Sequence, residues 1–162
     1  MPSIYILVGP PASGKSTWRE TYFAKLAEPT TVLSTDDMIE EYASLNNMTY
    51  SEAFPLVDFS ELDKKIYANM LAAFARQDNV IVDRTNLRIK GRRKFLANTP
   101  KTYKKIAVVF DIEYPALLNR LNIRAEKTGK HIPQKVVLDM IAGYEEPTLD
   151  EFDSIVIEKQ VV

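Results

Sequence analysis

Short apolar runs alternate along the chain with longer segments in which apolar residues recur every three or four positions. The short runs have the length and composition of β-strands, and the longer segments have the period of amphipathic helices. Alternation of this kind predicts an α/β fold with a parallel sheet. We expect strands at Ser3–Val8, Thr31–Ser34, Asn79–Asp83, Lys105–Asp111 and Phe152–Glu158.

Between the strands, the apolar positions and the stop signals predict the helices. The first helix is expected to end before Pro29, and a loop with Gly129 and Pro133 separates the last two. Helices are expected at Lys15–Ala27, across an apolar face running from Leu62 to Phe74, and at Arg88–Asn98, Pro115–Glu126 and Gln134–Gly143.

The segment Asp36–Asp58 has the least regular pattern. It is expected to be helical, with a break at Asn46-Asn47 and a kink at Pro55. The pair Ser60 and Asp63 has the spacing of a capping box, which predicts the start of the following helix.

Composition is typical of globular proteins and excludes several kinds of catalytic and metal-binding site. Its 162 residues suit one domain, 1–162, and 46% are hydrophobic while 27% are charged. The absence of cysteine excludes disulfides, thiolate catalysis and a cysteine-bound metal cluster. No apolar run approaches the ~20 residues of a membrane span, and the apolar start leads into a loop rather than a cleavage site. We therefore expect a cytoplasmic protein without a membrane partner.

The segment directly after the first strand matches G-x-x-x-x-G-K-[ST] at every fixed position. Glycines in this pattern let backbone N–H groups face a phosphate, and the following helix N-terminus adds partial positive charge. Lys15 is expected to reach the β- and γ-phosphates of ATP, and Ser16 to hold Mg²⁺. The predicted nucleotide-binding residues in this loop are Gly9, Pro10, Ala12, Ser13, Gly14, Lys15, Ser16 and Thr17.

Carboxylates follow the second and third predicted strands, where ligands gather in open α/β sheets. Asp36 or Asp37 could accept the proton of an attacking hydroxyl, or could instead cap the next helix. Asp83 ends an apolar strand, as does the Walker B carboxylate that orders Mg²⁺, although aspartate also opens turns. The sequence therefore predicts one candidate base and one candidate metal ligand here.

Two arginines on a late helix complete the candidate catalytic set. Arg120 and Arg124 are four residues apart and so project side by side, at the edge of the Leu117/Leu121 apolar face. Guanidinium groups clamp phosphates and stabilise transition-state charge. The segment 124–133 is expected to act as a small lid, although a pair of solvated arginines has the same spacing.

Charge is segregated along the chain, although the formal net charge is only −1. Asp36–Asp63 contains eight acidic residues and no basic one, whereas Arg84–Lys105 contains nine basic residues and no acidic one. The basic stretch, with Arg84, Arg88, Arg92 and Arg93, could follow a phosphate backbone or form a solvated helix face.

These landmarks resemble the P-loop kinases of the adenylate-kinase-like group, and more closely the 5′-kinase domain of bacteriophage polynucleotide kinases. The resemblance covers nearly the whole chain. It is carried by Gly9–Trp18, Asp36-Asp37, Thr85-Asn86-Leu87, Arg92-Arg93, Phe110-Asp111, the Arg120/Arg124 pair and Ile132-Pro133.

The resemblance implies a three-layer fold, with a parallel five-stranded sheet of order 2-3-1-4-5 and helices on both faces. It also implies transfer of the γ-phosphate of ATP to a hydroxyl. By position, Asp36 resembles the general base, Lys15 and Ser16 the phosphate and Mg²⁺ ligands, and the Arg120/Arg124 pair the lid arginines.

The chain departs from the phage pattern at three points. The arginine that lies three residues after the base aspartate is replaced by Ile39. The Asp-Thr-Asn of the family is Arg84-Thr85-Asn86 here, with its carboxylate displaced to Asp83. The phosphatase domain that follows in the phage enzyme has no counterpart in these 162 residues.

The sequence thus predicts an ATP- and Mg²⁺-dependent kinase acting on the 5′-hydroxyl of a DNA or RNA end. One alternative is a kinase for a small molecule such as a nucleoside, nucleotide, sugar or antibiotic, and another is an ATP-hydrolysing binding module. The predicted acceptor-binding residues are Asp36, Asp37, Arg84, Thr85, Asn86 and Arg88.

Overall fold

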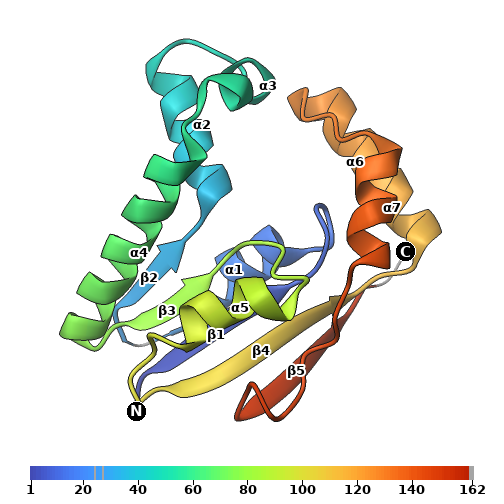
Figure 1. Ribbon diagram of the computed structural model, residues 1–162. Helices are drawn as coiled ribbons and strands as arrows, with labels where there is room; N and C mark the ends of the chain where they lie inside the picture. Colours follow the sequence, from blue (N-terminus) through green and yellow to red (C-terminus); the bar gives the residue numbers. More distant parts are fainter. Residues whose placement is uncertain (24, 27, 161–162) are drawn as a thin grey trace.

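A computed structural model describes residues 1–23, 25–26 and 28–160. Its centre is a five-stranded parallel sheet with the order β2-β3-β1-β4-β5 (Figure 1). This order confirms the one implied by the resemblance. The strands are β1 (Ser3–Val8), β2 (Thr30–Leu33), β3 (Asn79–Val82), β4 (Lys104–Asp111) and β5 (Ser154–Lys159).

Helices cover both faces of the sheet, as the resemblance implied (Figure 1). The described helices are α1 (Lys15–Phe23), α2 (Thr35–Leu45), α3 (Tyr50–Ala53), α4 (Phe59–Arg76), α5 (Ile89–Leu96), α6 (Tyr114–Thr128) and α7 (Gln134–Ala142), with a 3-10 turn at Phe54–Leu56. None of the described helices has both the length and the apolar character needed to cross a membrane.

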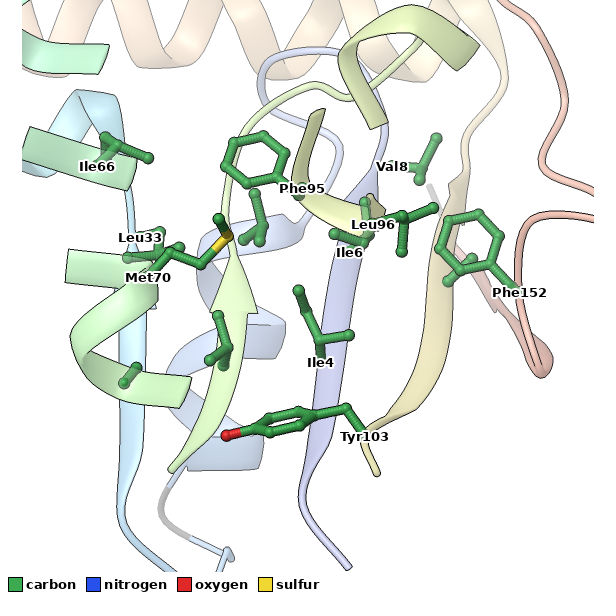
Figure 2. Packing of buried hydrophobic residues seen from close by; sticks show 14 of the residues in the cluster. Ile4, Ile6, Val8, Leu33, Ile66, Met70, Phe95, Leu96, Tyr103 and Phe152 are labelled. Carbon is green, nitrogen blue, oxygen red and sulfur yellow. The ribbon is translucent and has the colours of Figure 1, made fainter. Parts of the chain in front are cut away.

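The central strand β1 is buried on both sides because its side chains alternate between two cores. Ile4, Ile6 and Val8 face a cluster formed with α4 and α5, where Met70 and Phe95 are also buried (Figure 2). Residues of β1 that point the other way belong to a second cluster, against which Trp18 of α1 packs. The carboxyl ends of the central strands are therefore fixed from both faces.

Two helical arms rise beyond the carboxyl ends of the strands, on opposite sides (Figure 1). The α2–α3 arm has its own small core around Ile39, Ala43 and Ala53. The α6–α7 arm has another around Leu117, Leu121 and Val137. Each arm is thus a small packed unit attached to the main sheet.

The irregular segment breaks where the sequence predicted, but the capping prediction is wrong. Helix α2 ends at Leu45 with Asn46 as its C-cap, and the next residue, Asn47, has a φ of 53°. Helix α4 is capped by Asp58, whose carboxylate accepts hydrogen bonds from the next turn, and not by a Ser60/Asp63 box. Asp58 takes this role because it is the last residue with an extended backbone before the helix.

The other boundaries differ from the predicted ones by a few residues. Helix α1 ends at Phe23, and its predicted end, Ala27, lies outside the described residues. The predicted lid also begins inside α6, which continues to Thr128, so that residues 129–133 alone form the connecting loop.

Candidate active site

The loop between β1 and α1 is built from backbone groups held in strained or close positions. Ala12 and Gly14 have φ values of 64° and 104°, in the left-handed region. A Cβ on Gly9 would lie 2.6 Å from the Ser13 hydroxyl, so this approach requires glycine. The Gly9 N–H donates to the Thr85 carbonyl at 3.0 Å, which ties the loop to the end of β3.

The Lys15 side chain spans this loop. Its ammonium group donates to the carbonyls of Gly9 and Pro10, each at 2.7 Å. Burial lowers the pKa of Lys15 to about 8, although the nearby Asp83 and Asp36 carboxylates act in the opposite direction. A neighbouring anion such as a phosphate would stabilise the charged form of this buried ammonium group.

A cavity of about 740 Å³ opens over the loop and the carboxyl ends of the strands. It joins segments far apart in the sequence, namely the phosphate loop, the start of α2, the end of β3 and helix α6. The predicted site residues that line it are Ala12, Gly14, Lys15, Ser16, Thr17, Asp36, Asp37, Asp83, Arg84, Thr85, Arg120 and Arg124.

The remaining predicted residues do not line this first cavity. Gly9 and Pro10 contribute backbone carbonyls behind Lys15, and the Ser13 side chain is fully buried. Asn86 and Arg88 line a second cavity next to the first.

Arg19 is a component of the site that the sequence reasoning missed. Its Nη1 lies 2.9 Å from Asp83 Oδ2 and 3.0 Å from Asp37 Oδ2, so one guanidinium joins the ends of β2 and β3. The signal was present, because Arg19 is four residues after Lys15 and shares its helix face. The pairing itself needs the sheet order, which brings the two carboxylates together.

Asp36 does not cap α2, which was the alternative to its role as a base. Ser34 caps α2 instead, with its hydroxyl accepting from the Asp37 N–H at 3.2 Å. The Tyr50 hydroxyl donates to Asp36 Oδ1 at 2.6 Å, and burial together with this bond raises the pKa of Tyr50. Tyr50 therefore fixes one oxygen of the candidate base, and no motif in the sequence indicated it.

Asp83 lies directly after β3, where its side chain is only 9% exposed. Burial raises the pKa of Asp83, while Lys15 and Arg19 counteract this rise. Among the described residues, no group of three or more histidine, cysteine or acidic side chains could hold a metal by itself. Mg²⁺, however, commonly binds through one or two carboxylates and substrate phosphates. The Ser16 hydroxyl and the Asp83 carboxylate, which share the cavity, fit that donor set.

The two predicted arginines reach the cavity from the α6–α7 arm. Arg120 Nη1 donates to Gln160 Oε1 at 3.0 Å, so the residue after β5 also belongs to the site. Sequence analysis gave no reason to select Gln160, because only the position of β5 at the sheet edge brings it to Arg120.

Within the described residues, three side-chain contacts join the two arms. The Ser51 hydroxyl donates to the Gly129 carbonyl at 2.6 Å, and Lys130 forms an ion pair with Glu40. The Lys130 ammonium also lies over the Tyr50 ring, 4.6 Å from its centroid. The predicted lid thus contacts the arm that carries the candidate base.

Hydrogen bonds from buried side chains hold the loop after β3 in place. Asn86 has a φ of 48°, and its amide donates to the carbonyls of Leu7, Val82 and Arg84 at 2.8, 3.4 and 3.3 Å. The next link is Arg92, whose Nη1 donates to the Asn86 carbonyl at 2.9 Å.

Arg92 belongs neither to a phosphate-binding surface nor to a solvated helix face. Its side chain is 0% exposed, and its Nε and Nη2 lie 2.9 and 3.1 Å from the two carboxylate oxygens of Glu151. A buried guanidinium needs a partner of opposite charge, and here that partner, Glu151, lies 59 residues further along the chain. Neither sequence-based interpretation of the basic stretch therefore applies to this residue.

Ile39, which stands where the phage kinases have arginine, is 1% exposed and belongs to the core of the α2–α3 arm. It does not line the first cavity, although Asp36, Asp37 and Glu40 from the same helix do. The departure at this position therefore contributes to packing.

Comparisons with known proteins agree with this geometry. The chain matches the model of a family described as an AAA domain over residues 4–147. No curated protein sequence matches it. A chain of the Pnkp1/Rnl/Hen1 RNA repair complex is similar, with 26% identity and a TM-score of 0.67, over 88% of this chain and 43% of that chain. This chain therefore spans less than half of that relative.

Two further solved structures are similar in fold. Kti12 from Chaetomium thermophilum, in complex with ADP-AlF3, is 17% identical with a TM-score of 0.63, over 96% of this chain and 88% of that chain. A fungal RNA kinase is 19% identical with a TM-score of 0.56, over 96% of this chain and 73% of that chain. From the family match, the sheet order and the phosphate loop together, the chain belongs to the AAA domain family and has the P-loop kinase fold.

Proposed function

We propose that this protein is an ATP-dependent kinase that transfers the γ-phosphate to the 5′-hydroxyl of a DNA or RNA end. The observation that carries the proposal is the composition of the first cavity, which combines the phosphate loop, Asp36 and the Arg120/Arg124 pair. A module that only hydrolyses ATP can use the same carboxylate to position water, and it would release labelled phosphate in place of a labelled acceptor. The resemblance to phage polynucleotide kinases and the similarity to a chain of an RNA repair complex support the choice of acceptor.

In the proposed reaction, Asp36 accepts the proton of the acceptor hydroxyl, whose oxygen attacks the γ-phosphorus as the bond to the ADP oxygen breaks. Tyr50 orients the carboxylate by occupying Oδ1, which leaves Oδ2 for the acceptor. Lys15, Arg120 and Arg124 bind the charged phosphate oxygens. Mg²⁺, held by Ser16 and Asp83, would neutralise further charge on the phosphates.

The proposal is tested by offering labelled ATP and Mg²⁺ with 5′-hydroxyl oligonucleotides, nucleosides, nucleoside monophosphates and sugars. Label on the 5′ end of the oligonucleotides is the expected result. Asp36→Asn keeps the size of the side chain but cannot accept the proton, so transfer should fall by about 10²–10⁴-fold. Retention of the label on γ-phosphate with every acceptor, or near-normal turnover by Asp36→Asn, would contradict the proposal.

A second candidate is a kinase for a small-molecule acceptor. It is favoured by the carboxylates of Asp36, Asp37 and Glu40, which line the first cavity from α2 and repel a phosphate backbone to the extent that Arg19 and Lys130 leave their charge uncompensated. Label on a monomer but on no oligonucleotide would establish this candidate instead.

A further inference from the structure

A second cavity, of about 570 Å³, adjoins the candidate active site. Its lining residues belong to α4, α5 and α7 and to the loop between β3 and α5. Arg84 and Thr85 line both cavities and so mark where the two cavities adjoin. A ligand long enough to leave the first cavity past these two residues would enter the second.

The wall of the second cavity is basic. It contains Arg84, Arg88, Lys90 and Lys94, against two carboxylates, Asp63 and Asp139. Asp63 already pairs with Arg84, whose Nη2 lies 3.2 Å from Asp63 Oδ1. In the part of the chain that the structure describes, no ion pair involves the side chains of Arg88, Lys90 or Lys94. Their charge is therefore available to an anionic ligand.

The floor of this cavity is aromatic and includes an unused hydrogen-bonding group. The rings of Tyr67 and Phe95 stack with centroids 5.4 Å apart, and the Arg84 guanidinium lies over Phe95 at 5.9 Å. The Tyr67 hydroxyl oxygen is buried and has no hydrogen-bond partner among the described residues. Because Phe95 is only 2% exposed, the charge of the wall rather than base stacking on this ring would bind a single strand here.

We propose that the second cavity holds the part of the acceptor strand that follows its first nucleotide, with phosphodiester groups against Arg88, Lys90 and Lys94. This inference rests on the proposed function, because it assigns the first cavity to the 5′-terminal nucleotide. It also places the strand's phosphates beside Arg88, Lys90 and Lys94, away from the three carboxylates that α2 contributes to the first cavity. A monomeric acceptor does not reach the second cavity, so contacts there do not strengthen its binding.

Helix α5 supplies a matched control for the test. Lys94 lines the second cavity, whereas its neighbour Arg93 is exposed and lines neither the first nor the second cavity. Lys90→Ala/Lys94→Ala removes two cations from the wall, and Arg93→Ala removes one from the same helix outside it. The acceptors are a 5′-hydroxyl oligonucleotide of roughly ten nucleotides, within the usual span of a single-strand site, and a nucleoside 3′-monophosphate.

The measured quantity is the ratio of kcat/KM for the oligonucleotide to kcat/KM for the monomer. We expect Lys90→Ala/Lys94→Ala to lower this ratio at least tenfold and to flatten the salt dependence of oligonucleotide binding by about 1.4 in slope. Arg93→Ala should change the ratio less than twofold. An unchanged ratio in the double variant, or an equal loss in Arg93→Ala, would overturn the inference.

Failure of the proposed function is a separate outcome. If the wild-type protein labels no 5′-hydroxyl acceptor, the kinase assignment fails, and binding of a fluorescent single-stranded oligonucleotide then decides the fate of the second cavity. At least tenfold weaker binding by the double variant than by Arg93→Ala would support a strand site there. Equal binding by both variants, or no binding by the wild type, would reject it.

Discussion

Two loops lie side by side at the carboxyl ends of β1 and β3, yet they are built in different ways. The phosphate loop is shaped by its own backbone, with close approach at Gly9 and left-handed geometry at Ala12 and Gly14. The loop after β3 is shaped by side chains, through the Asn86 amide and the buried guanidinium of Arg92. One backbone bond, from the Gly9 N–H to the Thr85 carbonyl, joins the two.

The difference shows what each loop requires of the sequence. A loop that binds phosphate through backbone N–H groups needs a fixed local spacing, and a short motif contains all of it. A loop supported by side chains depends on partners elsewhere in the chain, and here the last partner is Glu151. The first kind of loop is therefore visible in one stretch of sequence, and the second is visible only after folding.

At the phosphate loop, a large effect on chemistry is expected. Lys15→Ala removes the side-chain cation and its bonds to the Gly9 and Pro10 carbonyls, from a loop whose turns are set by its backbone conformation. We expect kcat to fall by about 10²–10³-fold, with the melting temperature close to that of the wild type. Steady-state kinetics measure kcat, and thermal unfolding of the same preparation measures the melting temperature. A large fall in melting temperature would show that the loop does depend on this side chain.

The loop after β3 should show the opposite behaviour. Arg92→Met leaves Glu151 without its partner and the Asn86 carbonyl without its donor, so the free energy of unfolding should fall by about 3–5 kcal/mol. Denaturant titration measures this change. Arg93→Met, at the exposed neighbour, is the control and should stay within about 0.5 kcal/mol of the wild type. Similar stabilities for both variants would mean that the buried pair is not what holds this loop.

Asn86 tests whether the loop depends on backbone conformation as well as on hydrogen bonds. Asn86→Gly loses the bonds from the amide, which should lower the free energy of unfolding by about 1–3 kcal/mol. Asn86→Ala loses the same bonds and must also adopt a positive φ, so it should be less stable by about 1 kcal/mol more. Equal stability of the two variants would show that the loop relaxes out of the left-handed conformation.

The smallest effect is expected at Tyr50, which belongs to neither loop. Tyr50→Phe keeps the ring under Lys130 but removes the hydroxyl bond to Asp36. Loss of a hydrogen bond to a charged group corresponds to about a tenfold fall in kcat. The KM for ATP should change little, because the donor phosphates do not depend on this bond. A change in KM with kcat preserved would instead give Tyr50 a role in the contact between the two arms.

Much of the fold followed from local pattern. The alternation of strands and helices and the position of the phosphate loop required only neighbouring residues, and the structure confirms them. The cap of α4 was predicted wrongly because Ser60 and Asp63 have the required spacing, whereas capping depends on which residue keeps an extended backbone. The pair Arg120 and Arg124 could be selected because helical spacing sets their common direction.

What the sequence by itself determined is therefore the set of elements and the chemistry held within single segments, chiefly the phosphate loop. The tertiary structure decided the pairs that cross between segments: Arg19 with Asp83, Tyr50 with Asp36, and Arg92 with Glu151. It also decided that a basic second cavity lies beside the first. The physical reason is that the position of β3 between β2 and β1, and of β5 at the far edge, sets which distant side chains meet, and no local pattern encodes that order.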